Sequence, residues 1–279
     1  MEKEILQVKQ IEWFDDHFYK IRYVNEAKVE LEDYIPSVTT KLGALSKPWL
    51  AKWRGDVGNR EANLRTESAS ERGTRIHYAW ATFITGGAVI YNPFKNPPYT
   101  PEEILEIKKK HENNWTLTNQ GEMWDFLKLK KLVEVLKPNP VASETILYDI
   151  EHRDAGTSDN IFDIEAGSYL INGATPLKLP KGRYVCDLKT GASIGDGDLQ
   201  TACYAKMAQK SGYGTIKGTL IFHTQSGNRK GIEGLGVSYQ DEKQIDQKYQ
   251  DYRDIAKVWE RQFGHKKPII RQIPGLVTL

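Results

Sequence analysis

The stretch Arg183-Tyr-Val-Cys-Asp-Leu-Lys-Thr190 has the alternation of a β-strand with one apolar face. Successive side chains of a strand point to opposite faces, so Asp187 and Lys189 share one face. The opposite face carries Tyr184, Cys186 and Leu188 and is expected to pack into a core. A carboxylate can hold a divalent cation, and a neighbouring ammonium can orient a water, which together suit phosphodiester hydrolysis. The same acid-x-Lys spacing in a polar context, as at Glu106 and Lys108, is an ordinary solvated charge pair.

A second strand is expected in Ala155-Gly-Thr-Ser-Asp-Asn-Ile-Phe-Asp-Ile164, where apolar and polar residues alternate after a glycine. Asp159 lies near its start. Asn172-Gly173 lies midway between Asp159 and Asp187 and is a favoured two-residue hairpin turn. A hairpin folded there would bring the two aspartates nearly opposite each other. Prolines in the connection predict a tip that is wider than a simple hairpin.

Two more positions supply candidate metal ligands. Glu144 lies in a short strand expected over residues 141–148 and would add a third acidic group. His77 lies on a helix expected over residues 74–84, about 100° from Ile76 and thus at the rim of its apolar stripe. A histidine at the rim of an apolar stripe is usually an ordinary helix residue. Because candidate metal-binding aspartates also occur in this sequence, the metal-ligand interpretation of His77 is favoured.

A polar pair follows the second aspartate. Gln200 and Tyr204 are separated by four residues and therefore lie on one face of a helix. They are either a partly buried polar pair at the edge of the core or a pair that supports Lys189 or contacts a nucleic-acid backbone.

Taken in order, these pieces resemble the PD-(D/E)XK nuclease superfamily, in the RecB-like branch that includes phage recombination exonucleases and the mitochondrial genome maintenance exonuclease. The matching pieces are Ser37-Val-Thr39-Thr, Trp53-Arg54, Arg72-Gly-Thr-Arg75-Ile-His77, Ser143-Glu144, Gly156-Thr-Ser-Asp159, Asp187-Leu188-Lys189 and Gln200-Thr-Ala-Cys-Tyr204. The resemblance implies an α/β fold: a single restriction-endonuclease-like domain with a central mixed sheet flanked by helices.

The resemblance also implies a set of roles. One or two Mg²⁺ or Mn²⁺ ions would be bound by His77, Glu144, Asp159, Asp187 and the backbone carbonyl of Leu188. Lys189 would position the attacking water and offset charge on the phosphate. Gln200, Tyr204, Thr39, Arg54, Arg72 and Arg75 would support the site or bind DNA.

The expected function is that of a metal-dependent DNA exonuclease acting from a free end in recombination, repair or replication, with a single-strand annealing or replication protein as a further partner. The alternatives are a structure-specific or restriction-type endonuclease on the same fold and a catalytically silent nucleic-acid-binding module. A purely structural protein is disfavoured by the apolar alternation around Asp159 and Asp187.

The charge of the chain is nearly balanced, with 39 basic and 37 acidic residues, so attraction of the whole protein to nucleic acid is not indicated. Residues 41–75 are locally basic, with eight cations against four anions. Trp49 and Trp53 are interspersed among them, as in a groove that tracks phosphates and stacks bases. The simpler expectation is that both tryptophans belong to the core.

Two cysteines, Cys186 and Cys203, are both expected on apolar faces, which indicates a reducing compartment and excludes a four-cysteine iron–sulfur cluster. The sequence has no apolar run of membrane-span length and no signal peptide at its start. We therefore expect no membrane partner and a cytoplasmic location in a bacterial or phage-infected cell.

The chain is expected to form one domain over residues 1–279. Strands occupy 1–40, a helical DNA-approach region 41–137, the catalytic core 138–239, and a helix with a tail 240–279. Within the approach region, separate helices are expected over residues 61–70 and 74–84, followed by a breaker-rich loop over 86–101 that could act as a lid.

Overall fold

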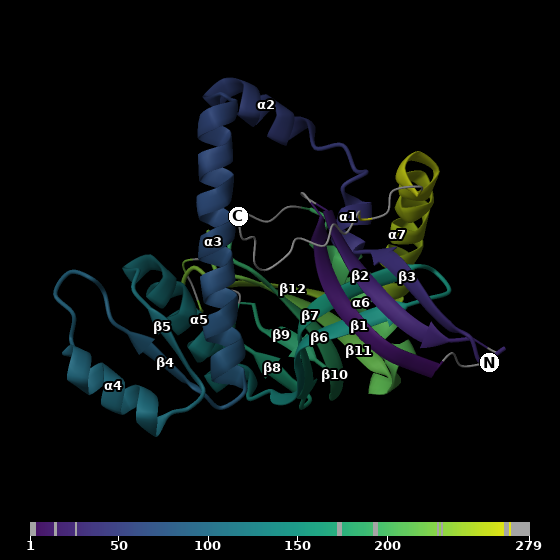
Figure 1. Ribbon diagram of the computed structural model, residues 1–279. Helices are drawn as coiled ribbons and strands as arrows, with labels where there is room; N and C mark the ends of the chain where they lie inside the picture. The colour runs from purple at the N-terminus through teal and green to yellow at the C-terminus, as the bar shows by residue number, and fades with distance from the viewer. Residues whose placement is uncertain are drawn as a thin grey trace, which may run out of the picture.

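A five-stranded mixed sheet lies at the centre of the computed structural model, in the order β12-β11-β10-β7-β6 (Figure 1). The structure describes residues 4–264 except 14–15, 26, 172–174, 192–194, 228 and 230, together with residue 268. The strands are β6 (Asn139–Asp149), β7 (Asp154–Ile164), β10 (Gly182–Lys189), β11 (Ile216–His223) and β12 (Gly236–Asp241). Strands β10 and β11 are parallel and the other neighbours are antiparallel. The expected mixed α/β architecture is thus confirmed.

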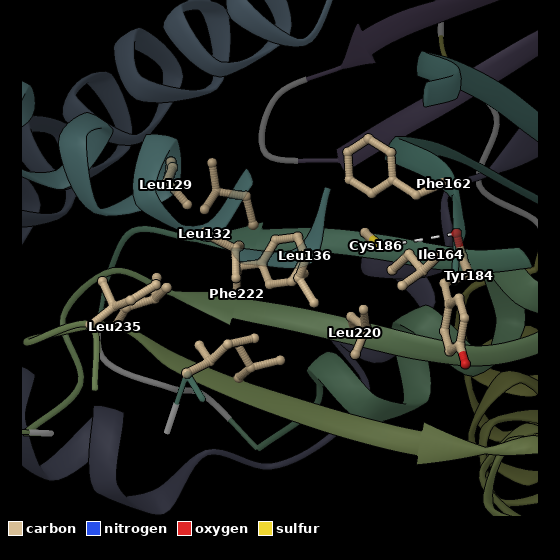
Figure 2. Close-up of a cluster of buried hydrophobic side chains, with 14 of the residues drawn as sticks. Leu129, Leu132, Leu136, Phe162, Ile164, Tyr184, Cys186, Leu220, Phe222 and Leu235 are labelled. Atoms are coloured by element: carbon tan, nitrogen blue, oxygen red, sulfur yellow. Dashed lines mark hydrogen bonds between the residues drawn. The ribbon is translucent and has the colours of Figure 1, made fainter. Parts of the chain in front are cut away.

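Helices cover both faces of this sheet. On one face lie α3 (Asn59–Ile84) and α5 (Gln120–Leu136), and on the other lie α1 (Val38–Leu42), α6 (Gly197–Ala208) and α7 (Glu242–Phe263). Figure 2 shows the first interface, where leucines of α5 belong to one buried cluster with Phe162, Cys186 and Phe222 of the sheet. Val185 and Ile161 belong to the opposite cluster, with α6 and α7. The alternation predicted for both strands is therefore confirmed.

The register between β7 and β10 brings the two aspartates together. Ile164 pairs with Gly182 and Asn160 pairs with Cys186, so the next position places Asp159 opposite Asp187. The expected turn at residues 172–173 lies outside the described residues. The connection carries a short antiparallel ribbon, β8 (Gly167–Tyr169) with β9 (Leu177–Leu179), in agreement with a tip wider than a simple hairpin.

The amino-terminal strands form a separate antiparallel sheet: β1 (Glu4–Trp13), β2 (Asp16–Val24) and β3 (Glu30–Pro36). Its buried residues Tyr19, Ile21 and Ile35 pack on Ala155 of β7. A third small sheet consists of β4 (Ala88–Tyr91) and β5 (Asn114–Leu117), which are parallel and flank α4 (Pro101–Lys110).

Two local expectations were wrong. Residues 61–70 and 74–84 are not separate helices, because α3 runs without a break from Asn59 to Ile84. Gly73 continues the helix because it has a packing role: a Cβ there would lie 3.0 Å from Thr190 Oγ1 at the end of β10. The expected loop over 86–101 contains strand β4, which pairs with β5, a partner that lies beyond α4 in the sequence.

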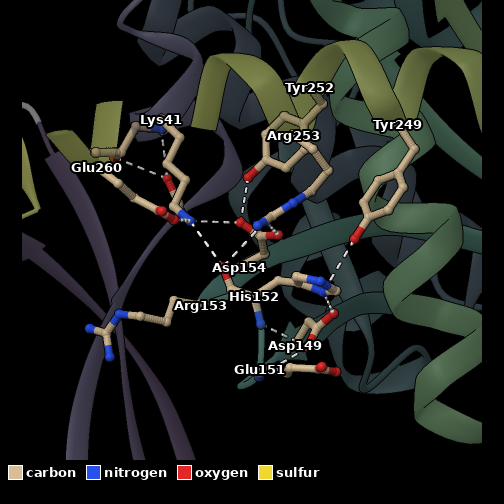
Figure 3. A network of polar contacts seen from close by, with 12 residues as sticks. Lys41, Asp149, Glu151, His152, Arg153, Asp154, Tyr249, Tyr252, Arg253 and Glu260 are labelled. Atoms are coloured by element: carbon tan, nitrogen blue, oxygen red, sulfur yellow. Dashed lines mark hydrogen bonds and ion pairs between the residues drawn. The ribbon is translucent and has the colours of Figure 1, made fainter. Parts of the chain in front are cut away.

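A buried ion network joins α1, β7 and α7 (Figure 3). Asp154 Oδ1 accepts hydrogen bonds from Lys41 Nζ at 2.8 Å and from the Tyr252 hydroxyl at 2.7 Å, while Arg253 donates to Oδ2 at 2.9 Å. Lys41 also contacts Glu260 at 3.0 Å. The side chains of Lys41 and Asp154 are almost completely inaccessible to solvent, so this network fixes the start of the strand that carries Asp159. None of the described helices combines the length and apolar character needed to cross a membrane.

Candidate metal centre at the strand ends

Asp187 lies near the end of β10, opposite Asp159 in the middle of the neighbouring strand β7. The backbone N–H of Leu188 donates a hydrogen bond of 2.6 Å to Asp159 Oδ2 and fixes this carboxylate beside the end of β10. Both aspartates are buried. Because two buried carboxylates repel each other, the pair needs positive charge nearby.

His77 reaches this pair from α3. Its Nδ1 lies 3.4 Å from Asp159 Oδ1, and its Nε2 lies 3.1 Å from the backbone carbonyl oxygen of Leu188. Helix α3 is held in place one turn further on, where Trp80 Nε1 donates a hydrogen bond to Asn160 Oδ1. The imidazole therefore lies between a carboxylate and a strand-end carbonyl.

Glu144 completes the group from β6. The neighbouring pairs, Ser143 with Asn160 and Thr145 with Ser158, place Glu144 opposite Asp159. Its φ of 47° is in the left-handed region, which is unusual for a non-glycine residue inside a strand. Such a conformation costs on the order of 1 kcal/mol and occurs preferentially at functional sites.

The donor set suits a hard divalent cation. Ligand atoms of His77, Glu144 and Asp159 all lie within 4.8 Å of one another. Asp187 Oδ2 is buried and forms an ion pair of 2.7 Å with the Lys189 ammonium. A carboxylate oxygen has two lone pairs, so it can accept this contact and still ligate a cation. The groups that would hold Mg²⁺ or Mn²⁺ are His77, Glu144, Asp159, Asp187 and the carbonyl of Leu188.

The crowding of charges alters the acidities of these groups. Burial lowers the pKa of His77, but the charge and hydrogen bond of Asp159, with the charges of Asp187 and Glu144, outweigh it and raise the pKa to about 9. Burial and the charges of Asp159 and Asp187 raise the pKa of Glu144 to about 7, against the opposing effect of His77. Burial also raises the pKa of Asp187, although Lys189 opposes this. The metal-free site therefore attracts protons as well as cations.

Lys189 is held by a short chain of polar contacts. Its ammonium donates to Gln200 Oε1 at 2.9 Å, and the amide of Gln200 donates to Asp187 Oδ1 at 3.2 Å and to the Tyr204 hydroxyl oxygen at 3.1 Å. Tyr204 is buried against Gly156, where a Cβ would lie 2.3 Å from the ring. Gln200 and Tyr204 thus lie on one face of α6, and Gln200 connects Tyr204 to Lys189.

A cavity of about 480 Å³ opens beside these groups. Its lining includes His77, both aspartates, Lys189, Gln200 and the exposed Thr39. Lys47 and Asp196 also line it and form an ion pair of 2.8 Å that joins the start of α2 (Pro48–Val57) to the start of α6. The sequence does not predict this pair, because the two residues are far apart in the chain and each lies in an ordinary polar context.

The three predicted DNA-binding arginines do not line this cavity. Arg72 donates to the carbonyl of Thr190 at 2.9 Å and forms an ion pair with buried Asp125 of α5. Arg75 forms ion pairs with Glu122, also buried, and with Glu71. Arg54 is partly exposed and donates to Asn63 at 3.0 Å. Arg72 and Arg75 thus join α3 to α5, and of the three only Arg54 has no ion pair among the described residues.

The expectation that the tryptophans of the basic segment are core residues was wrong for Trp49, which is 54% exposed. Helix α2 contains no buried residue. Because no described element buries this helix, the Trp49 side chain faces solvent and is accessible to a ligand.

A second acidic group lies at the turn between β6 and β7, where Asp149, Glu151 and His152 come close together. Asp149 already accepts a hydrogen bond from His152 (Figure 3) and another, of 2.5 Å, from Lys210. The Lys210 ammonium supplies the positive charge that a metal would bring, so this group is structural.

Neither a scan against protein-family models nor a search of curated proteins gives a match to this chain.

Proposed function

We propose that the protein is a metal-dependent deoxyribonuclease of the RecB-like PD-(D/E)XK type that hydrolyses phosphodiester bonds from DNA ends. The observation that carries the proposal is the meeting of buried Asp159 and Asp187 with Lys189 at the end of β10, where Glu144 and His77 add two further ligand groups. When bound, a divalent cation supplies Lewis-acid activation of water and of the phosphate. The remaining roles belong to the side chains.

Lys189 is the group placed to act on the phosphate. Gln200 and Asp187 hold its ammonium at 2.9 Å and 2.7 Å, so the charge has one fixed position. A preorganised cation of this kind orients the attacking water and offsets the negative charge that develops on the phosphate oxygens. His77 and Leu188 N–H hold Asp159 in the orientation needed for ligation.

The size of the cavity supports cleavage at the end of a DNA strand. A volume of about 480 Å³ is that of a pocket for one small molecule. Helix α3 forms part of its wall through Ala69, Ser70 and Gly73. A space of this size suits the end of a single strand better than a continuous duplex.

The test compares end-labelled linear DNA with covalently closed circles, single-stranded and double-stranded, in Mg²⁺ or in chelator. The expected result is Mg²⁺-dependent release of mononucleotides or short products from linear DNA, with circles left intact. Fragmentation of circles at similar rates would replace the exonuclease with an endonuclease on the same fold. Binding without any cleavage in Mg²⁺ or Mn²⁺ would favour a silent nucleic-acid-binding module.

A further inference from the structure

Tyr78 follows His77 on α3 and its ring is unusually exposed for a large aromatic side chain next to a buried site, at 53%. The ring rests on Trp115 of β5, with centroids 4.9 Å apart and an angle of 34° between the planes. This contact restricts the motion of the ring, so a flat aromatic surface is held in a fixed place.

This surface lies in a pocket beside the metal centre. The pocket has a volume of about 380 Å³ and is lined by Ser70, Gly73, Thr74, His77, Tyr78 and Glu144. Ser70, Gly73 and His77 also line the larger cavity that contains Asp159 and Asp187. The two spaces therefore adjoin along the same face of α3, and two of the candidate metal ligands, His77 and Glu144, line the smaller one.

The chemistry of the pocket fits a nucleobase better than a phosphate. Apart from His77, its described lining carries no basic side chain, and Glu144 would repel an anion. The hydroxyl of Thr74 is already used, because it donates to the Ser70 carbonyl at 3.1 Å. Besides the Ser70 hydroxyl, the main remaining feature is the aromatic ring of Tyr78, which favours a planar ring without charge.

We propose that Tyr78, supported by Trp115, is the stacking platform for the base next to the phosphate that is cleaved, and that the substrate strand is unpaired at this point. This inference rests on the proposed nuclease function. A base that stacks on a protein side chain has left its own helical stack, so the platform selects single-stranded DNA or an end that has been opened. It reads no particular sequence, because every base has a π-face.

The test locates the stacked base by pairing protein variants with abasic DNA. A single-stranded oligonucleotide is made in versions with one abasic residue moved along the strand, and binding is measured by fluorescence anisotropy with Ca²⁺ in place of Mg²⁺. The wild-type protein should lose about 10-fold in affinity when the abasic residue falls at one position, the size of one base–aromatic stack. Tyr78→Leu should lose a similar factor on the intact strand and nothing further at that position.

Two variants serve as controls. Tyr78→Phe keeps the stacking face and should bind as the wild type does. Trp124→Leu removes an aromatic side chain that is 59% exposed on α5, outside both spaces, and should leave the abasic profile unchanged. Thermal melting of each variant checks that the fold is retained.

The possible failures can be told apart. A wild-type protein that cleaves linear DNA but shows no sensitive abasic position overturns this inference alone. The same holds if Tyr78→Leu and the abasic residue lower affinity independently, or if blunt duplex ends are cleaved as fast as single strands by both the wild type and Tyr78→Leu. Absence of metal-dependent cleavage by the wild type overturns the proposed function, and this inference with it.

Discussion

The ring of Tyr204 lies directly against the backbone of Gly156, so closely that a Cβ at position 156 would be 2.3 Å from its Cε1 atom. Through Gln200, this ring helps to set the position of Lys189. The contact between Gly156 on β7 and Tyr204 on α6 therefore affects the position of the candidate catalytic Lys189 through protein contacts alone.

Gly156→Ala should displace Tyr204 and with it the amide that holds Lys189. We expect cleavage to fall at least 10-fold, with a stability loss of about 1–3 kcal/mol from overpacking. Cleavage assays and chemical denaturation measure the two effects. Gly55→Ala is the matched control, because this helical glycine has open space around it and alanine is the better helix former. Full activity in Gly156→Ala would show that Tyr204 does not position the lysine.

Asp187→Ala and Lys189→Ala should each reduce cleavage to background while circular dichroism stays that of the wild type. Neither side chain belongs to a hydrophobic cluster, so their loss leaves the apolar packing of the core in place. Single-turnover assays with excess enzyme separate this chemical defect from weak binding. Wild-type turnover in either purified variant would refute the catalytic assignment.

Mn²⁺ or Mg²⁺ should raise the melting temperature, because a ligand that binds only the folded state stabilises it by about 2.7 kcal/mol at one hundred times its Kd. Asp159→Asn keeps the shape of the side chain and removes one charge, and the metal-induced rise should shrink. Differential scanning fluorimetry over a metal titration measures this. An undiminished rise in Asp159→Asn would place the ion elsewhere.

The metal-free protein should become less stable as pH rises from 5 to 9. Folding raises the pKa of Glu144 from 4.5 to about 7, so the folded state favours its protonated form, and stability is lost across that interval. Folding raises the pKa of His77 from 6.5 to about 9, so the folded state favours the protonated imidazole. The stability that this preference gives the folded protein is lost as the pH rises across that higher interval. Melting temperatures in chelator should fall throughout. Glu144→Gln should flatten the lower part of the curve and His77→Gln the upper part; profiles parallel to that of the wild type would contradict the assignment.

Arg72 and Arg54 should behave differently although both come from the basic segment. Arg72→Gln breaks an ion pair with buried Asp125, which keeps Lys128 at 2.8 Å, so we expect a stability loss of about 1–3 kcal/mol. Arg54→Gln should leave stability unchanged and weaken DNA binding, with a shallower dependence of affinity on salt. Denaturation and salt-dependent binding curves distinguish the two roles. Equal stability of both variants would mean that Arg72 is not structural.

The sequence predicted best where the information is local. The alternation from Arg183 to Lys189 fixed which residues face the core, and the position of the expected turn gave the register that sets Asp159 opposite Asp187. The spacing of Gln200 and Tyr204 placed both on one face of α6.

The errors came from tertiary contacts, which a local pattern does not contain. Ser70 and Gly73 resemble a helix break, but packing of Gly73 against Thr190 favours a continuous α3. Arg72 looked like a free cation because its partner, Asp125, is on another helix. The left-handed backbone of Glu144 has no signal in the sequence, since glutamate does not favour that conformation.

The ion network around Asp154 makes helix α7 necessary for the stability of strand β7. Tyr252 and Arg253 supply two of the three described side chains that bind this buried carboxylate, and Lys41 supplies the third. Deleting α7 would strip Asp154 of two partners at the base of the strand that leads to Asp159, and a buried charge that has lost its partners is strongly destabilising. A proteolytic cut within α7 should therefore also loosen the distant part of β7 and β10 where the metal ligands lie.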